Sequence, residues 1–304
     1  ELNSEIVSKI PFENMKKLKK LYLKGLNLIN HSIDFIFKIP SLTQLDLSDN
    51  DIFSNHSFNG ILSNLETLHL LNSSLDTFDG KINISHFSSL KSLHMSFNKI
   101  KFIKLNYFYF SNQIERLNLS HNLIEFIESG ALNKTNYLIV LDISFNRLKK
   151  FSHQHLWSLE YLYINNNQLI TVRTDLYIHT ILIDLSFNNL IDDFNYEYSN
   201  FFVTIKYNNN KIIKIDYNAA YSNFIFNIDF SYNYLIKINE NFFIKFSRVK
   251  EVYLNNNKFN NFSKNLFKEL FSLEILNLSS NYLTHIQIGL FDDLYSLKHL
   301  DLSY

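Results

Sequence analysis

The sequence has no cysteine and few residues that break regular structure, with five glycines and two prolines among 304 residues. A chain without cysteine forms no disulfide and holds no C-x-x-C motif, which ordinarily argues against a secreted protein. Five scattered glycines exclude a phosphate-binding G-x-x-x-x-G-K loop and a dinucleotide-binding G-x-G-x-x-G loop, and no H-E-x-x-H zinc motif occurs. We therefore expect no enzyme, no bound metal and no cofactor.

Net charge and long apolar runs are also lacking. Lysine plus arginine and aspartate plus glutamate each number 29, so the formal net charge is zero, and the isoelectric point is about 7.4. Proteins that bind nucleic acid through its phosphates usually present a basic face, so we expect no nucleic-acid partner. No apolar run approaches the roughly 18 residues of a membrane-spanning helix. Any membrane attachment would lie in segments outside this chain.

The sequence does contain an internal repeat. The pattern L-x-x-L-x-L-x-x-N-x-L recurs along the chain, most clearly at Leu42–Ile52 and Leu273–Leu283, and six of the twelve intervals between repeats are 24 residues long. The repeats begin at Leu18, Leu42, Leu65, Leu90, Ile114, Leu138, Leu159, Thr180, Phe202, Ile225, Val249, Leu273 and Leu297. This period indicates a solenoid, because one repeat cannot bury its own apolar edge and needs neighbours on both sides.

Each position of the repeat has an expected direction. Counted from the first leucine, positions 4 and 6 point into the core, and positions 2, 3, 5, 7 and 8 point outward. Position 9 is asparagine in ten of the twelve complete repeats, and its amide can satisfy buried backbone groups of the turn after the strand. Asn146→Ala or Asn188→Ala should therefore cost roughly 1–3 kcal/mol. An outward change such as Asp184→Ala should cost little.

The repeats resemble those of a known class. Segments such as LDISFNRL at 141–148, LNLSHN at 117–122 and the phenylalanine at position 19 are similar to the "typical" 24-residue leucine-rich repeats of animal extracellular proteins. That subclass includes Toll and Toll-like receptors, chaoptin-like adhesion proteins and Slit-like guidance proteins. The resemblance implies an α/β solenoid, a horseshoe with a parallel concave sheet and an irregular or short-helical convex side. In extracellular members the disulfides lie in terminal caps, so a repeat region without cysteine is compatible with them.

The repeats indicate a single domain over residues 1–304. No linker, charge block or change in composition interrupts them. Both ends fall inside a repeat, because Ile10–Met15 resembles the tail of an earlier repeat and Tyr304 occupies position 8 of the thirteenth. Terminal repeats need polar caps, so we expect a fragment of a larger protein.

The resemblance implies a protein-binding recognition module, part of a cell-surface receptor or cell-adhesion ectodomain. Its partner would be a protein ligand or a second copy of the chain. Five N-x-Ser/Thr sequons lie outside the expected strands, where a glycan fits. These candidate glycosylation sites are Asn30, Asn55, Asn83, Asn133 and Asn261. The alternative is an intracellular leucine-rich-repeat scaffold or regulatory domain, which the absence of cysteine and the neutral charge both permit.

The middle repeats carry the candidate ligand-binding surface. Their outward positions hold apolar and aromatic side chains with spaced carboxylates, a composition typical of protein-binding surfaces. The candidates are Ile139, Val140, Asp142, Tyr161, Tyr163, Ile181, Leu182, Asp184, Phe226 and Asp229. Val203 is also expected to point outward. The alternative is that these short, irregular repeats shift register and bury some of these side chains.

Two histidines occupy position 5 of consecutive repeats. His69 and His94 should be parallel neighbours roughly 5 Å apart, with Asp46 and Asn118 beside them. Such a cluster would suit a metal or a pH-sensing site. The simpler interpretation is a pair of solvated surface histidines.

Overall fold

The computed structural model describes residues 9–30, 32–108, 113–151, 156–172, 180–191, 203–216, 224–244 and 246–304. The chain divides into two compact units. The N-terminal unit comprises residues 1–148 and 153–159, and the C-terminal unit comprises residues 149–152 and 160–304. That residues 1–304 form one domain stays a prediction.

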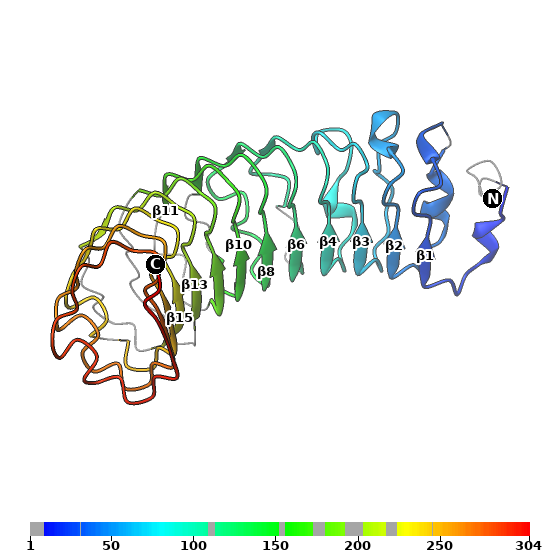
Figure 1. The fold of residues 1–304 in the computed structure, drawn as a ribbon. Helices are drawn as coiled ribbons and strands as arrows, with labels where there is room; N and C mark the ends of the chain where they lie inside the picture. The colour runs from blue at the N-terminus through cyan, green and yellow to red at the C-terminus, as the bar shows by residue number, and fades with distance from the viewer. Residues whose placement is uncertain are drawn as a thin grey trace. The chain divides into compact units, whose positions relative to one another are not determined.

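The N-terminal unit is built on a parallel sheet to which each repeat contributes one short strand (Figure 1). The strands are β1 (Lys20–Tyr22), β2 (Gln44–Asp46), β3 (Thr67–His69), β4 (Ser92–His94), β6 (Arg116–Asn118) and β8 (Val140–Asp142). Equivalent positions face each other, so that Leu45 pairs with Leu68 and Leu68 with Leu93. The predicted parallel register is confirmed.

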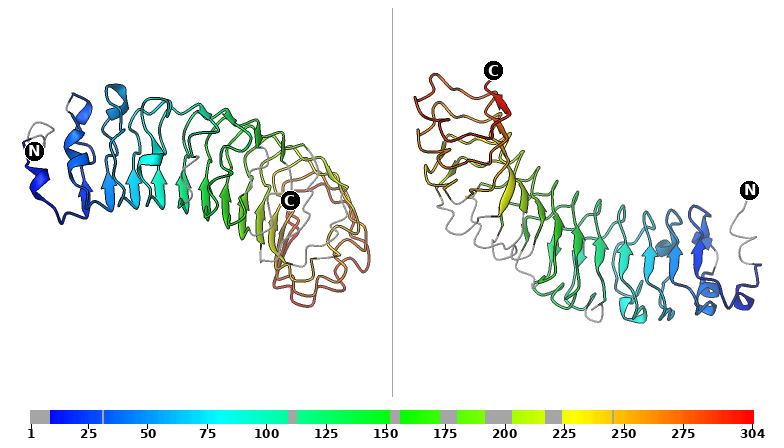
Figure 2. Two further views of the ribbon diagram at one scale, coloured as in Figure 1. Left: turned by 180° about the vertical axis from the view of Figure 1, so that it is seen from behind. Right: turned by 90° about the horizontal axis from the view of Figure 1, so that it is seen from below.

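The return segments of the N-terminal unit run along the opposite side and contain only short elements (Figure 2). They are the 3-10 turns η1 (Phe12–Asn14), η2 (Leu28–Asn30), η3 (Asp34–Lys38), η4 (Ile52–Ser54) and η5 (Ile84–His86), and the paired strands β5 (Phe102–Ile103) and β7 (Phe126–Ile127). None of the residues that the structure describes lies in an α-helix. The irregular, short-helical character predicted for this side is confirmed.

The C-terminal unit repeats the same plan. Its main sheet holds β10 (Tyr161–Tyr163), β12 (Leu182–Asp184), β13 (Val203–Lys206), β15 (Ile225–Asp229), β17 (Glu251–Tyr253), β18 (Ile275–Asn277) and β19 (His299–Asp301). The return segments carry β9 (Lys150–Phe151), which pairs with β11 (Thr171–Val172), and β14 (Lys214–Ile215), which pairs with β16 (Lys237–Ile238). All of these pairings are parallel.

The core lies between the main sheet and the return segments. Leu45 and Leu47, at positions 4 and 6, are fully buried, as the alternation predicts. On the return side of the C-terminal unit, Phe243 and Phe267 are also fully buried, with ring centroids 5.9 Å apart. The aromatic rings of successive repeats therefore pack into a column, which adds shape-specific contacts to the burial of leucine.

The position-9 asparagines make the bonds that the sequence predicts. Asn188 Nδ2 donates to the carbonyls of Ile164, Leu185 and Ser186 at 3.1, 3.1 and 3.2 Å, and its Oδ1 accepts from the Leu169 amide at 3.0 Å. One side chain thus pairs backbone groups of two repeats. Because those groups are buried, the asparagine holds the stacked repeats together.

The residue just before each asparagine adopts a left-handed backbone. Position 8 has a positive φ in every complete repeat, from +47° to +69°. The residues are Gly25, Asp49, Asn72, Phe97, His121, Phe145, Asn166, Phe187, Asn209, Tyr232, Asn256 and Ser280. This conformation turns the chain at the end of the strand and projects the position-8 side chain from the edge of the sheet.

Candidate functional site

The candidate carboxylates belong to a recurring turn motif. Oδ1 of Asp142 accepts hydrogen bonds from the backbone amide and hydroxyl of the serine two residues later, at 3.0 and 2.6 Å. Asp184 makes the same pair at 3.1 and 2.5 Å, and Asp229 accepts from the amide of Ser231 at 2.8 Å. One oxygen of each carboxylate orders the turn. The other oxygen remains for interactions with neighbours or a ligand.

Strands β10 and β12 bring five candidate residues together in the C-terminal unit. Tyr161 pairs with Leu182, and Tyr163 pairs with Asp184, across the parallel ladder. Ile181 directly precedes β12, and its amide donates to the carbonyl of Glu160 at 2.7 Å. The side chains of Tyr161, Tyr163, Ile181 and Leu182 are half-buried. They form an apolar and aromatic patch on the outward face of the sheet, called the β10–β12 patch below.

Two residues of the middle repeats are buried, contrary to the outward expectation. Asp184 is 9% exposed, and its Oδ2 lies 3.7 Å from the Lys206 ammonium. Val203 is fully buried, because the register between β13 and β15 shifts after this residue and pairs it with Ile225. The register shift that was the alternative interpretation therefore occurs at Val203.

Position 5 of the C-terminal unit carries a row of alternating charge. Asp184, Lys206 and Asp229 are successive neighbours in the ladder. Burial raises the pKa of the Asp229 carboxyl, while the hydrogen bonds from Ser231 and the positive charge of Lys206 act in the opposite direction. Tyr163 and Tyr253 flank the row at its two ends. Charges fixed beside apolar side chains would orient a partner on this face.

The remaining candidates lie apart from the β10–β12 patch in the fold. Phe226 is half-buried on β15, separated from β12 by β13, and the Lys250 ammonium lies 5.1 Å from its ring centroid. Ile139, Val140 and Asp142 are half-buried at β8, in the N-terminal unit. The structure thus places Asp229 and Phe226 in the same unit as the patch and the other three in the other unit.

An exposed aromatic stack at position 8 lies outside the candidate residues named from the sequence. The rings of Phe97 and Phe145 each lie 4.2 Å from the ring of His121 and within 9° of parallel. Phe97 is 56% exposed and Phe145 is 44% exposed. The three rings form a ledge along the edge of the N-terminal sheet. Phenylalanine recurring at position 8 was the available signal.

His69 and His94 are stacked, with ring centroids 4.5 Å apart and planes within 9°. The predicted proximity is confirmed, but His94 is not a solvated histidine. Burial lowers its pKa to about 4, and the charges of His69 and Arg116 act in the same direction while Asp46 opposes them. Its Nε2 lies 2.9 Å from the Ser92 hydroxyl. Within the described ranges, no group of three or more His, Cys, Asp or Glu residues is arranged to hold a metal ion.

The candidate glycosylation residues lie on the surface of their units. Asn30, Asn55, Asn83 and Asn261 are exposed and Asn133 is half-buried. None of these five residues lies in a strand. None of the helices in the described part of the chain has the length and hydropathy that a membrane crossing requires.

Comparison with known proteins agrees with this geometry. A family model described as "Leucine rich repeat" matches residues 112–169 and 247–304. A chain of the glycosylated Drosophila Toll–Spatzle complex is 17% identical, with a TM-score of 0.81 over 99% of this chain and 41% of that chain. A search of the curated proteins gives no match.

Two further solved structures share the fold. A chain of the TLR13–ssRNA13 complex is 17% identical, with a TM-score of 0.67 over 96% of this chain and 41% of that one. A chain of the LRIM1/APL1C complex is 20% identical, with a TM-score of 0.70 over 97% and 54%. This chain spans about two fifths of the Toll and TLR13 chains that it matches. The predicted fold class is confirmed: the chain has the fold of a leucine-rich-repeat solenoid, which it shares with the Toll chain.

Proposed function

We propose that this leucine-rich-repeat chain is a protein-recognition module of a cell-surface receptor or adhesion protein. The observation that carries the proposal is the β10–β12 patch, where Tyr161, Tyr163 and Leu182 stay half-buried on the outward face beside a fixed row of charge. Side chains of this kind supply most of the energy of protein interfaces when a partner covers them. The fold supports the same role, since a solenoid presents an extended sheet to a ligand.

Candidate residues of each unit would contact a ligand on the outward face of that unit's own sheet. In the C-terminal unit, Tyr161 and Leu182 would be the apolar anchors, and Lys206 and Asp229 would set the orientation of the partner. In the N-terminal unit, Ile139, Val140 and Asp142 would form a contact surface of their own on the outward face of β8. The aromatic ledge of Phe97, His121 and Phe145 adds an exposed apolar edge to that unit.

A protein partner, or a second copy of the chain, fits the charge better than a nucleic acid does. Equal numbers of acidic and basic residues give no excess of cations to neutralise phosphates. The Toll and LRIM1/APL1C structures are complexes of proteins, whereas TLR13 was solved with ssRNA. We propose no catalytic role for the module, because the outward face of each main sheet is open and gives little means to orient reacting groups.

We place the module on the outside of the cell, with Asn30, Asn55, Asn83, Asn133 and Asn261 as glycan acceptors. The exposure of four of these five residues supports this location. The alternative is an intracellular leucine-rich-repeat scaffold. Glycans on these sequons in the native host would favour the extracellular location. A complete absence of glycans would favour the intracellular scaffold.

The test is a binding screen with the secreted chain displayed as a multivalent probe. The probe is applied to an array of extracellular proteins from the source organism, with this chain itself and single-stranded RNA as additional spots. We expect at least one protein spot to retain the probe and the RNA spots not to retain it. Retention by RNA alone, or by no protein including the chain itself, would contradict the proposed function.

A further inference from the structure

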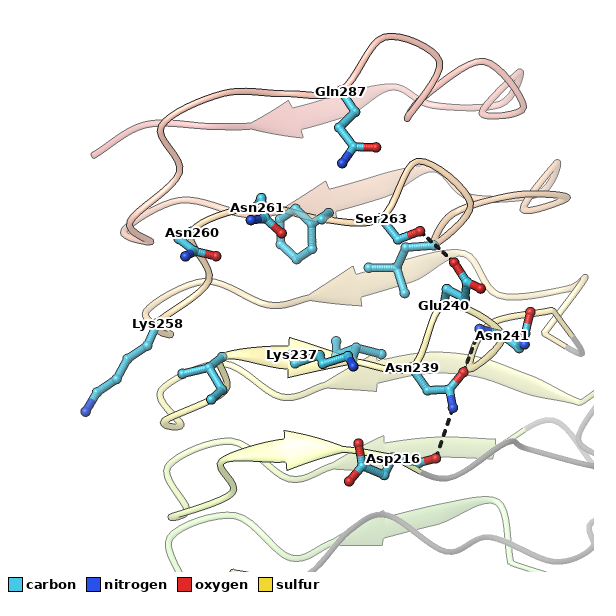
Figure 3. Close-up of a pocket in the computed structure, with 14 residues that line it drawn as sticks. Asp216, Lys237, Asn239, Glu240, Asn241, Lys258, Asn260, Asn261, Ser263 and Gln287 are labelled. Carbon is cyan, nitrogen blue, oxygen red and sulfur yellow. Dashed lines mark hydrogen bonds between the residues drawn. The ribbon is translucent and has the colours of Figure 1, made fainter.

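The C-terminal unit holds a cavity of about 1030 Å³ that none of the proposed protein-binding residues lines (Figure 3). Residues from four successive repeats line it, between Asp216 and Gln287. Its volume is at the upper end of the range for small-molecule sites, about 300–1,000 Å³. The cavity is therefore large enough for a ligand of two or three rings.

Side-chain amides form much of the polar lining of the cavity, and three of these described amides have no hydrogen-bond partner within the protein. Among the described residues, the amides of Asn241, Asn260 and Asn261 make no side-chain hydrogen bond. In contrast, Asn239 donates to the Asp216 carbonyl at 3.1 Å and accepts from the Asn241 backbone amide at 3.0 Å. Each free amide offers both donors and acceptors. The cavity can thus bond a ligand whose groups also do both.

The charges that line the cavity balance. Lys237 and Lys258 oppose Asp216 and Glu240. Glu240 already accepts a hydrogen bond from the Ser263 hydroxyl at 2.9 Å, which Figure 3 shows at the cavity wall. Without a net charge in the lining, an ionic ligand gains little over a neutral one. A neutral, hydroxyl-rich ligand fits these groups better than a phosphate or an ammonium does.

The cavity also has an apolar wall. Ile236 lines it and is 53% exposed, and the nearly buried Phe262 and Leu266 line it as well. Sugars combine hydroxyl edges with faces of C–H groups, so they need both an amide-rich rim and an apolar surface. From this combination we propose that the cavity is a binding site for a neutral saccharide.

Such a saccharide has two possible sources, and they share one chemistry. Asn261 lines the cavity and begins the sequon Asn261-Phe262-Ser263, so a glycan linked to its amide nitrogen would begin in the same cavity as the free amides of Asn241 and Asn260. A free oligosaccharide would use the same amides and the same Ile236 wall. The first source rests on the proposed extracellular location, whereas the second does not.

The test uses N,N′-diacetylchitobiose and two matched variants. Ile236 and Ile213 occupy position 12 of neighbouring repeats and are 53% and 51% exposed, but only Ile236 lines the cavity. For the unglycosylated chain, saturation-transfer NMR should detect the disaccharide, and Ile236→Asp should weaken its binding at least tenfold while Ile213→Asp leaves it unchanged. For the chain from a secretory host, native endoglycosidase release of the Asn261 glycan should be at least tenfold slower than release at Asn55.

The binding and release measurements together distinguish the two sources of the saccharide. Slow release at Asn261 that Ile236→Asp abolishes identifies the chain's own glycan as occupant. Disaccharide binding with normal release identifies a free saccharide. No disaccharide binding together with equal release at Asn261 and Asn55, or equal effects of Ile236→Asp and Ile213→Asp, would overturn the saccharide site. Because the protein array is scored separately, either proposal can fail while the other stands.

Discussion

At the scale of single residues, the asparagine at position 9 closes each repeat. Asn146 Nδ2 donates to the carbonyls of Leu119, Ile143 and Ser144, each at 3.0 Å, and Oδ1 accepts from the Ile124 amide at 2.9 Å. An alanine leaves all of these backbone groups without a partner. Buried polar groups without partners are costly because they have also lost their bonds to water.

We expect Asn146→Ala to lower the free energy of unfolding by about 1–3 kcal/mol. Gln44→Ala is the control, because Gln44 is half-buried and makes no side-chain hydrogen bond in the described part of the chain. Its cost should stay within about 0.5 kcal/mol. Denaturant titration measures both, and equal midpoints for the two variants would refute the assigned roles.

His94 makes stability depend on pH. Its pKa is lowered to about 4 in the folded chain, whereas an unfolded histidine titrates near 6.5. Between these values the unfolded state binds the proton more readily, so the contribution of His94 is present above pH 6.5 and is lost as the pH falls toward 4. The melting temperature should therefore drop more between pH 7 and pH 4.5 in the natural chain than in His94→Gln. An equal drop would show that His94 is not the group responsible.

The sequence predicted the partners of position 9 but not the burial of Asp184 at position 5. Asn146 and Asn188 follow a strict pattern, and the structure confirms their bonds. Asp184 has the outward parity of its strand, yet neighbours cover it, and Oδ1 accepts two bonds from Ser186. The expectation that Asp184 is exposed is therefore wrong, and from its burial and hydrogen bonds we expect Asp184→Ala to cost about 1 kcal/mol. Alternation gives the direction of a side chain but not how its neighbours cover it.

At the scale of elements, the turn after each strand adopts a left-handed residue at position 8. Glycine and asparagine tolerate this conformation, as at Gly25 and Asn72, but a phenylalanine pays a steric penalty of about 1 kcal/mol or more. The sequence contained this signal, since Gly, Asp or Asn fills position 8 in half of the complete repeats. The aromatic residues at position 8 of other repeats made this pattern harder to recognise. Their stacking could be seen only once φ and the register were known.

Phe187→Asn should stabilise the C-terminal unit by about 0.5–1 kcal/mol, because Asn accepts a left-handed backbone more readily than Phe does. Phe187 has φ of +53° and is 51% exposed. Phe145→Asn is the comparison, since Phe145 stacks on His121 and such a contact contributes about 0.5–1.5 kcal/mol. Chemical unfolding of both variants should show a gain for the first only. A loss at Phe187 as large as that at Phe145 would contradict the backbone argument.

At the scale of the whole molecule, the repeat period predicted the solenoid and its parallel pairing, because every leucine had to meet its equivalent in the next repeat. Predicting the fold class required only the repeat pattern. Predicting the position of a binding surface also required the three-dimensional structure, since the candidates Ile139 and Leu182 belong to different compact units. The position in the repeat could identify these side chains as outward. It could not predict which of them the structure would bring together.

Expression in a secretory host should attach glycans at several of the five candidate sequons. Asn30, Asn55, Asn83 and Asn261 are exposed, and Asn133 is half-buried, so we expect its occupancy to be lowest. Glycopeptide mass spectrometry gives the occupancy of each residue, and Asn55→Gln should remove one glycan mass only. A secreted chain without any glycan would argue for the intracellular alternative.

The central claim is that the outward face of the C-terminal sheet binds a protein. The most direct measurement is the affinity of the protein found by the array for the natural chain, for Leu182→Asp and for Gln44→Asp, by surface plasmon resonance. Leu182 and Gln44 both occupy position 3 of their repeat, at the start of a strand, and both are half-buried, so each variant adds one charge to the same kind of site. We predict that Leu182→Asp weakens binding more than tenfold, or about 1.4 kcal/mol, and that Gln44→Asp changes it less than twofold. Equal affinities for the natural chain and Leu182→Asp would contradict the account.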